Sequence, residues 1–198
     1  MPIEEVAAIS ESRQAALRTL LPELLAGRRE VTLEIGCGHG HFLTAYAAGH
    51  PTEFCVAIDL IADRLERAER KTRRAGVTNV AWVRASAEDL LAVWPADVSF
   101  GPRIFILFPD PWPKRRHWKN RLIQTAFLSE LARRSGPGTQ LCFRTDHTPY
   151  FAAARANIAA HPDWTIEESA RWPFEVVTVF QARAGGHESL VARRVDAV

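Results

Sequence analysis

Residues 31–40 read VTLEIGCGHG, a short apolar segment that runs directly into glycines at every second position. Glycine lets the backbone turn tightly and approach a ligand closely. The dinucleotide-binding pattern GxGxxG would require glycine at position 41, where the chain has His41. The spacing is instead GxGxG, preceded by the acid Glu34, and it predicts a ligand-binding loop after a strand. A tight turn without a ligand is the alternative interpretation.

Strand-like and helix-like segments alternate outward from this loop. Short apolar strands are expected at residues 31–35, 54–59, 79–85, 103–108, 139–145 and 164–170. Helices are expected at residues 12–26, 41–48, 61–76, 87–94, 118–136 and 148–160. This alternation predicts an α/β fold with a parallel sheet. Because ligands bind beyond the carboxyl ends of such strands, the candidate site residues are those that follow each strand.

Polar side chains do follow several of the expected strands. Asp59 ends the second, where a carboxylate can accept hydrogen bonds from both hydroxyls of a ribose. Aspartate is also a good helix N-cap, so capping is the alternative. Ser86 follows the third strand and is either a ligand contact or a helix cap. Asp146 follows the fifth and is either a cap or a second acid that lines the pocket.

The loop after the fourth expected strand is the most informative segment, with the sequence PDPWPKRRH at residues 109–117. Three prolines in five positions predict a stiff loop. The loop presents the acid Asp110, the ring of Trp112 and then a run of cations. Stacking on a ring combined with cationic contacts to phosphates is a common way to hold single-stranded RNA. The alternative is a core tryptophan beside ordinary surface cations.

Charge is concentrated in the same part of the chain. The net charge is only +2, but residues 101–134 contain eight basic residues against two acidic ones. The remainder of the chain is therefore mildly acidic. A local basic patch of this kind indicates an anionic partner that docks at one place, while a solvated helix face is the alternative.

Length and composition indicate one globular domain. The chain has 198 residues, and its hydrophobic share of 47% excludes a disordered or collagen-like protein. Three separated cysteines predict neither a zinc site nor a disulfide framework, and no third ligand accompanies His39 and His41, so we expect no metal. No apolar run approaches the roughly 20 residues of a membrane span, and no secretory signal is visible. We therefore expect a cytoplasmic protein without membrane contact.

Four segments together closely resemble the bacterial tRNA (guanine-N7)-methyltransferase (TrmB) family. They are LEIGCGHG (33–40), AIDL (57–60), FPDPWPKRRHWKNR (108–121) and RTDHTPY (144–150). The resemblance implies the Rossmann-like class I S-adenosylmethionine-dependent methyltransferase fold, with a seven-stranded, mostly parallel sheet whose last strand is antiparallel. It implies one domain over residues 1–198, with a helical N-terminal segment (1–30) and a C-terminal segment on the substrate side (173–198).

The resemblance also implies a reaction. A methyl group would pass from S-adenosylmethionine to N7 of a guanine in the tRNA variable loop, at position 46 in the family. Guanine N7 has an in-plane lone pair and no proton, so it can attack directly without a general base. A tRNA-binding protein of the same fold with weak or no catalysis is the alternative, and both a monomer and a homodimer remain open.

Carried over by position, the resemblance implies three groups of site residues. The cofactor-binding positions are Glu34, Gly36, Gly38, Gly40, Asp59, Ser86, Ala87 and Asp110, the last of which is also catalytic. The substrate-binding positions are Lys114, Asp146, Thr178, Phe180 and Gln181. The RNA-binding positions are Arg115, Arg116, His117, Lys119 and Arg121.

Three positions depart from the family pattern, and one of them is Ser86, where the family commonly has Asp or Asn before the alanine. The family usually has glutamate at the position of Asp59, which keeps the negative charge but places it on a longer side chain. The family also has glutamate at the position of Gln181. Glutamine can hydrogen-bond but cannot place a negative charge beside a developing cation. Residues 175–184 alternate in polarity as a strand does, whereas the family would have a loop or helix there.

Overall fold

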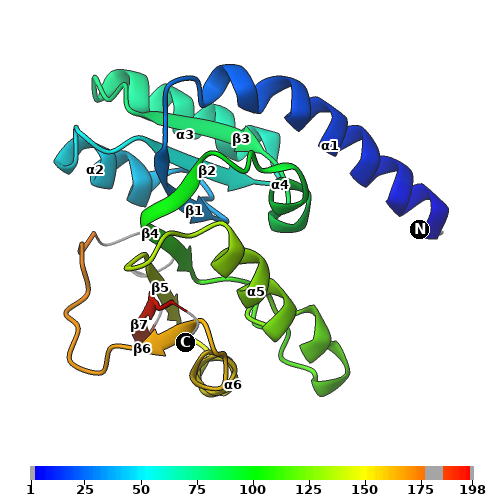
Figure 1. The fold of residues 1–198 in the computed structure, drawn as a ribbon, viewed down its shortest axis with the longest axis vertical. Helices are drawn as coiled ribbons and strands as arrows, with labels where there is room; N and C mark the ends of the chain where they lie inside the picture. The colour runs from blue at the N-terminus through cyan, green and yellow to red at the C-terminus, as the bar shows by residue number, and fades with distance from the viewer. Residues whose placement is uncertain (1–2, 177–184, 197–198) are drawn as a thin grey trace.

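The computed structural model describes residues 3–176 and 185–196, and these form one seven-stranded sheet with helices on both faces (Figure 1). The strands are β1 (Glu30–Ile35), β2 (Cys55–Asp59), β3 (Val80–Arg84), β4 (Ser99–Leu107), β5 (Gln140–Thr145), β6 (Trp164–Ile166) and β7 (Glu188–Arg194). The helices are α1 (Ile3–Leu24), α2 (His41–Gly49), α3 (Ala62–Arg74), α4 (Ala87–Val93), the 3₁₀ helix η1 (Arg115–Asn120), α5 (Thr125–Arg133) and α6 (Thr148–Ala159).

The strand order is β3-β2-β1-β4-β5-β7-β6. Strands β1 to β5 are paired in parallel, and β7 is antiparallel to both of its neighbours. The order reverses between β1 and β4, which is the switch point at which parallel sheets bind ligands. The expected seven-stranded sheet with an antiparallel last strand is therefore confirmed.

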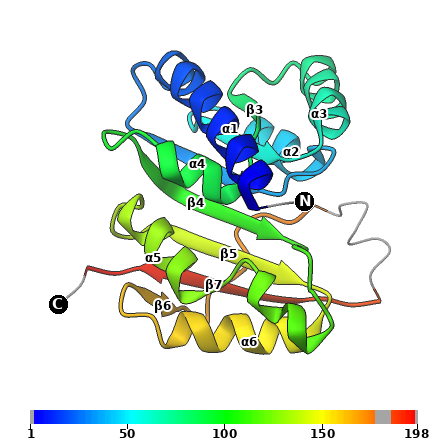
Figure 2. The ribbon, with the colours of Figure 1, turned by 90° about the vertical axis from the view of Figure 1, so that its right-hand side faces the viewer.

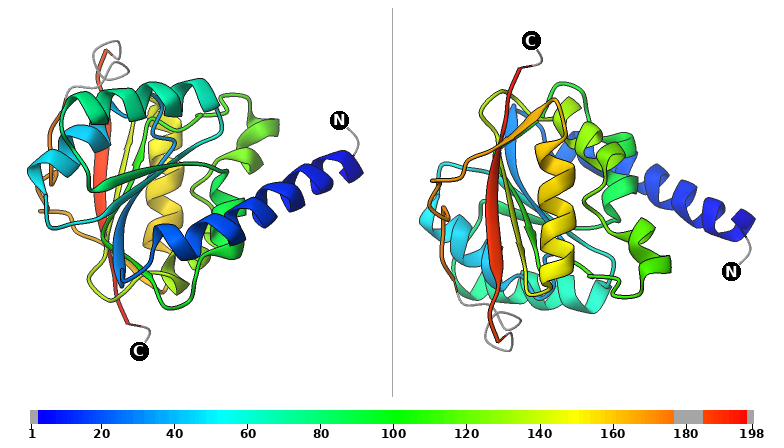
Figure 3. Two further views of the ribbon diagram at one scale, coloured as in Figure 1. Left: turned by 90° about the horizontal axis from the view of Figure 1, so that it is seen from above. Right: turned by 90° about the horizontal axis from the view of Figure 1, so that it is seen from below.

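Two apolar layers enclose the sheet. On one face, α1, α4, α5 and α6 pack against it, as Figure 2 shows, and their buried side chains form the larger core. On the other face, α2 and α3 cover the β1–β3 half. A C-terminal strap, residues 167–176, covers the β4–β5–β7 half with Trp172 and Phe174. The amino-terminal part of α1 extends away from the sheet (Figure 3).

Helix α3 illustrates how the sequence pattern creates this arrangement. Its buried residues are Leu65, Ala68 and Thr72, which lie three and four positions apart and so share one face. The remaining positions are mostly charged and point to solvent. The helix ends before Gly76, whose φ of 66° suits a left-handed stop.

Four expected elements differ from the structure. The strand expected at 103–108 is β4, which begins four residues earlier, at Ser99. The helix expected at 118–136 is instead η1 followed by α5, because Arg121 and Ile123 bond to residues distant in sequence rather than within a helix. The strand expected at 164–170 ends at Ile166, after which the strap begins. The first helix begins at Ile3 rather than at residue 12.

Candidate functional site

A cavity of about 580 Å³ opens at the carboxyl ends of β1, β2 and β4. Its lining combines loops that are far apart in sequence, as expected for residues that follow parallel strands. Seven of the predicted cofactor positions line it: Glu34, Gly36, Gly38, Asp59, Ser86, Ala87 and Asp110.

The glycine loop turns tightly above β1 and β2. Gly36 and Gly38 have φ values of 78° and 54°, which favour glycine. The backbone N–H groups of Gly36 and Cys37 donate to the carbonyl of Ile58, at 2.9 and 3.0 Å. These bonds attach the loop to β2 and hold its backbone at the cavity wall.

Gly40 has a packing role in addition to the one expected. It is absent from the cavity lining, and a Cβ at this position would lie 2.5 Å from Ala68 and 2.6 Å from Trp82. Its φ of 66° also favours glycine. Gly40 is therefore required for the close packing of the start of α2 against α3 and β3, and its expected contact with the cofactor stays a prediction.

Asp59 connects two loops of the cavity. Its carboxylate accepts the backbone N–H of Gly38 at 2.9 Å and that of Ile61 at 2.9 Å. Arg64 lies 3.5 Å from the same carboxylate. Asp59 therefore supports the start of α3, which was the alternative interpretation, and also lines the cavity.

Glu34 is buried beneath the glycine loop, and its Oε2 has no hydrogen-bond partner among the described residues. Burial, with a further contribution from the negative charge of Asp59, raises the pKa of Glu34 to about 8, although the N–H of Leu43 opposes the shift. A buried acceptor without a partner at a cavity wall is suited to a cationic or hydrogen-bond-donating ligand group.

Apolar side chains border the same cavity. Leu60 and Ile61 are 48% and 46% exposed, which is unusual for large aliphatic side chains beside a pocket. Ser86 caps α4 by accepting the N–H of Asp89 at 3.0 Å, so capping is observed while the residue also lines the cavity. Sequence reasoning missed Leu60 and Ile61, although their place directly after Asp59 was a usable signal.

The proline-rich loop after β4 is strained as well as stiff. Phe108 and Trp112 have φ values of 50° and 45°, a region that residues other than glycine rarely adopt. The N–H of Phe108 donates to the carbonyl of Arg144 at 2.8 Å, which ties the loop to β5. Asp110 and Trp112 line the cavity from this loop, and Trp112 is 36% exposed and stacked on His117.

Arg121 does not belong to the RNA-facing set. It is only 3% exposed, and its guanidinium donates to the carbonyls of Pro111 and Pro149. The same group lies over the rings of Trp118 and Tyr150, at 4.4 and 5.0 Å. Since its charge is enclosed by the protein, Arg121 braces the loop, and its expected contact with RNA is corrected.

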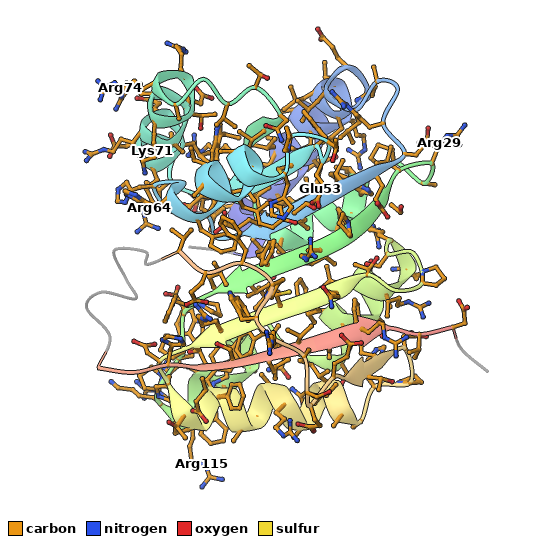
Figure 4. All side chains as sticks on the ribbon, turned by 90° about the vertical axis from the view of Figure 1, so that its left-hand side faces the viewer. Arg29, Glu53, Arg64, Lys71, Arg74 and Arg115 are labelled. Atoms are coloured by element: carbon orange, nitrogen blue, oxygen red, sulfur yellow. The ribbon has the colours of Figure 1, made fainter. Side chains whose placement is uncertain are left out.

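The other cations of the loop are exposed to solvent. They are Lys114, Arg115, Arg116 and Lys119, and Arg115 points outward in Figure 4. Lys114 and Asp146 lie outside the cavity lining, although Asp146 directly follows β5 and is exposed. His147, rather than Asp146, caps α6 by accepting the N–H of Tyr150.

The strap is fixed next to this site by Arg144 on β5. Its guanidinium donates to both carboxylate oxygens of Glu175, at 2.9 and 3.0 Å, and to Ser189. It also lies 4.1 Å from the centre of the Trp172 ring. Thr178, Phe180 and Gln181, expected to bind substrate, lie outside the described residues, directly after this strap.

Comparison with known proteins identifies the family. Residues 28–186 match a family described as "Putative methyltransferase". The tRNA (guanine-N(7)-)-methyltransferase of Caulobacter sp. (strain K31) is 34% identical over 173 residues, which cover 81% of this chain and 76% of that protein. The enzyme of the same name from Rhodospirillum rubrum is 35% identical over 184 residues, or 81% of this chain and 71% of that protein. The chain belongs to the tRNA (guanine-N7)-methyltransferase family.

Solved structures agree on the fold. An aminoglycoside resistance methyltransferase, NpmB1, superposes with a TM-score of 0.61 at 20% identity, covering 90% of this chain and 93% of that chain. A 16S rRNA (adenine(1408)-N(1))-methyltransferase with cosubstrate SAM superposes with a TM-score of 0.58 at 18% identity. The superposition covers 96% of this chain and 91% of that chain. The family member described here thus has the class I S-adenosylmethionine-dependent methyltransferase fold.

Two further features concern the described residues only. None of the helices they form combines the length and apolar character needed to traverse a bilayer. No cluster of three or more His, Cys, Asp or Glu side chains within them is arranged to hold a metal ion.

Proposed function

We propose that this chain transfers a methyl group from S-adenosylmethionine to N7 of a guanine in the variable loop of tRNA. One observation carries the proposal. The glycine loop and Asp59 line the same cavity as Asp110 and Trp112, whose loop continues into exposed cations. This arrangement supports a nucleoside site that lies next to an RNA-facing surface.

The cavity residues fit the methyl donor. Asp59 is placed to accept hydrogen bonds from ribose hydroxyls, while the exposed side chains of Leu60 and Ile61 offer apolar contact to an adenine ring. The unpartnered Oε2 of Glu34 suits the cationic amino-acid end of the donor, whose positive charge favours loss of the proton that burial keeps on Glu34 in the donor-free protein. Ser86 and Ala87 complete the adenine side. The bound donor supplies an electrophilic methyl group on a sulfonium centre.

The chain then needs to position guanine rather than to deprotonate it. Because N7 carries a lone pair and no proton, catalysis rests on alignment and on electrostatics. Asp110 lies at the cavity wall, where its carboxylate can accept hydrogen bonds from the N1–H and amino group of guanine. The negative charge of Asp110 also stabilises the positive charge that develops on the methylated base.

The remaining assignments concern the RNA around that base. We place Asp146 and Lys114 on the substrate side of the cavity, together with Thr178, Phe180 and Gln181 beyond the strap. The exposed cations Arg115, Arg116 and Lys119, with His117, contact phosphates of the tRNA backbone. The target guanine must leave its stacked position to reach the cavity. Such an enzyme works where tRNA is processed, in the cytoplasm.

The test is methylation of unmodified tRNA transcripts with labelled donor. We expect the wild-type chain to label N7 of a variable-loop guanine, and a transcript with adenine at that position to be inert. Asp110→Asn should lower kcat by about 100-fold, because it removes the charge at similar shape. Asp97→Asn, an exposed acid before β4, is the matched control and should leave kcat unchanged.

Two outcomes would contradict parts of the proposal. Full turnover by Asp110→Asn would remove Asp110 from the reacting centre. Tight tRNA binding by the wild-type chain without methyl transfer at saturating donor would favour a tRNA-binding protein instead of an enzyme.

A further inference from the structure

A second group of cations lies on α3, apart from the loop already described. The helix holds six basic and three acidic residues. Arg67, Arg70, Lys71 and Arg74, here called the α3 ridge, follow a spacing of three, four and seven positions and so share one face. These four side chains and Ala75 line an open hollow of about 470 Å³. A hollow walled by cations is suited to an anionic group such as a phosphate.

The α3 ridge borders the cavity of the candidate site. Arg64, in the first turn of α3, lines that cavity. The ammonium of Lys71 donates to the carbonyl of His39 at 2.6 Å, and His39 also lines the cavity. In Figure 4, Arg64, Lys71 and Arg74 project from α3 at the upper left of the view, and Arg115 projects at the bottom. Arg64 and His39 line the same cavity as Asp110 and Trp112 of the proline-rich loop, so cations of α3 and cations of that loop approach the cavity from different sides.

Packing does not account for the α3 ridge. The side of α3 that packs on the sheet is Leu65, Ala68 and Thr72, so the arginines are not needed for burial. Arg67 pairs with Asp63 at 3.0 Å and Arg70 with Glu66 at 3.8 Å, and all four of these side chains are more than half exposed. Exposed pairs within one helix contribute little, so a phosphate can replace the carboxylate as partner.

We infer that the α3 ridge is a second tRNA-binding surface, which contacts backbone phosphates on a different side of the cavity from the proline-rich loop. The inference rests on the proposed function. An RNA whose base enters the cavity must cross its mouth, and cations approach the cavity from both α3 and the proline-rich loop. Since Lys71 is engaged with His39, the contacts to RNA are assigned to Arg67, Arg70 and Arg74.

The test compares two triple variants that remove equal charge. The ridge variant is Arg67→Gln, Arg70→Gln and Arg74→Gln. The control variant is Arg28→Gln, Arg29→Gln and Arg193→Gln, three exposed arginines toward the edge at which the parallel strands begin: Figure 4 labels Arg29 there, and Arg193 on β7 pairs with Gln140, the first residue of β5. The affinity for tRNA is measured over a range of salt concentrations, alongside donor affinity by calorimetry and thermal unfolding.

We expect the ridge variant to bind tRNA at least about 10-fold more weakly near 0.15 M salt. The slope of log K against log salt should become shallower by about 2 to 3, because about one unit is lost per phosphate contact. Donor affinity and melting temperature should match the wild type. The control variant should keep the wild-type slope.

If the ridge variant keeps the wild-type tRNA affinity and the wild-type slope of log K against log salt, the inference is overturned. The α3 ridge would then be a solvated surface or a site for an acidic protein. Equal losses in both variants would also overturn it, because they would indicate a response to net charge rather than contact. If the wild-type chain methylates tRNA in either case, the proposed function stands. If the wild-type chain neither binds nor methylates tRNA, both fail.

Discussion

Asp59 shows how a single side chain can connect two loops of a candidate binding site. It accepts backbone N–H groups from both Gly38 and Ile61, and so connects the glycine loop to the start of α3. We expect Asp59→Ala to weaken donor binding by at least about 10-fold, since an N–H group left without an acceptor costs about 1–3 kcal/mol. Calorimetry with S-adenosylhomocysteine measures this. Asp63→Ala, an exposed acid on α3, should bind normally, and equal loss in both variants would contradict the role.

The raised pKa of Glu34 predicts that its contribution to the stability of the fold falls as the pH rises. Its pKa is raised from about 4.5 to about 8, so the native state holds a proton that the unfolded chain has released. The contribution of Glu34 to stability is therefore complete below about pH 4.5 and is lost as the pH rises toward 8. Through this one group, the free energy of unfolding can change by at most about 1.4 kcal/mol per pH unit.

Urea unfolding of the donor-free protein between pH 5 and 9 tests this expectation. The difference in unfolding free energy between wild type and Glu34→Gln should shrink up to about pH 8 and then level off. A difference that is constant across this range would show that Glu34 is not protonated in the folded protein.

At the scale of elements, the loop between β4 and α5 depends on Arg121 for its shape. Its guanidinium donates to the carbonyls of Pro111 and Pro149. It also lies over the rings of Trp118 and Tyr150. Lysine keeps the charge but lacks the planar fork, so Arg121→Lys should destabilise the fold by about 1–3 kcal/mol. Arg116→Gln, at an exposed position of the same loop, should leave stability unchanged and weaken tRNA binding only. Denaturant unfolding and tRNA titration together separate the two residues, and equal stability losses would contradict the distinction.

The strap, residues 167–176, is the basis of a separate prediction about the KM for tRNA. Glu175 connects it to Arg144, and the strap leads directly to the proposed substrate residues Thr178 and Gln181. We expect Glu175→Gln to weaken this connection, because a neutral amide replaces a charged acceptor. The KM for tRNA should rise several-fold, while donor affinity stays the same. A parallel loss of donor affinity would mean that the strap supports the whole cavity instead. Glu168→Gln, which removes the exposed partner of Arg155, is the control.

For the whole molecule, donor binding should be visible as stability. The cavity is built from loops after β1, β2 and β4, so a bound nucleoside connects parts that are distant in sequence. A ligand at 100 times its Kd stabilises the native state by about 2.7 kcal/mol. For a chain of this size that corresponds to a rise in melting temperature of about 5–10 °C. Calorimetric scans with S-adenosylhomocysteine measure the shift, and no shift at any concentration would refute the donor site.

Much of the site was predictable because its signals are local. Glycine spacing, the acid at a strand end and the proline-rich loop depend on neighbouring residues, and residues from each of them line the cavity. Glu34, Asp59 and Asp110 do line one cavity. The alternation of helices and strands predicts a parallel α/β sheet, for which right-handed crossovers allow few arrangements, while the antiparallel last strand was expected only from the resemblance.

Other features depend on contacts between distant segments and have no local signal. Gly40 looks like its neighbours in the glycine loop, yet the proximity of Ala68 and Trp82 gives it a packing role as well. Arg121 looks like the other loop cations, yet Pro149 and Tyr150 enclose it, and the expected helix at 118–136 is broken by the same contacts.

By itself, the sequence determined the fold class, the strand ends that line the cavity and the cationic loop, because helix and strand periodicity and turn chemistry act over a few residues. Only the tertiary structure decided which glycines line the cavity, that Arg121 is buried among the loop cations, and that α3 brings Arg64 to the cavity wall. Burial and proximity are set by packing between elements far apart in the chain, and no short stretch of sequence contains that information.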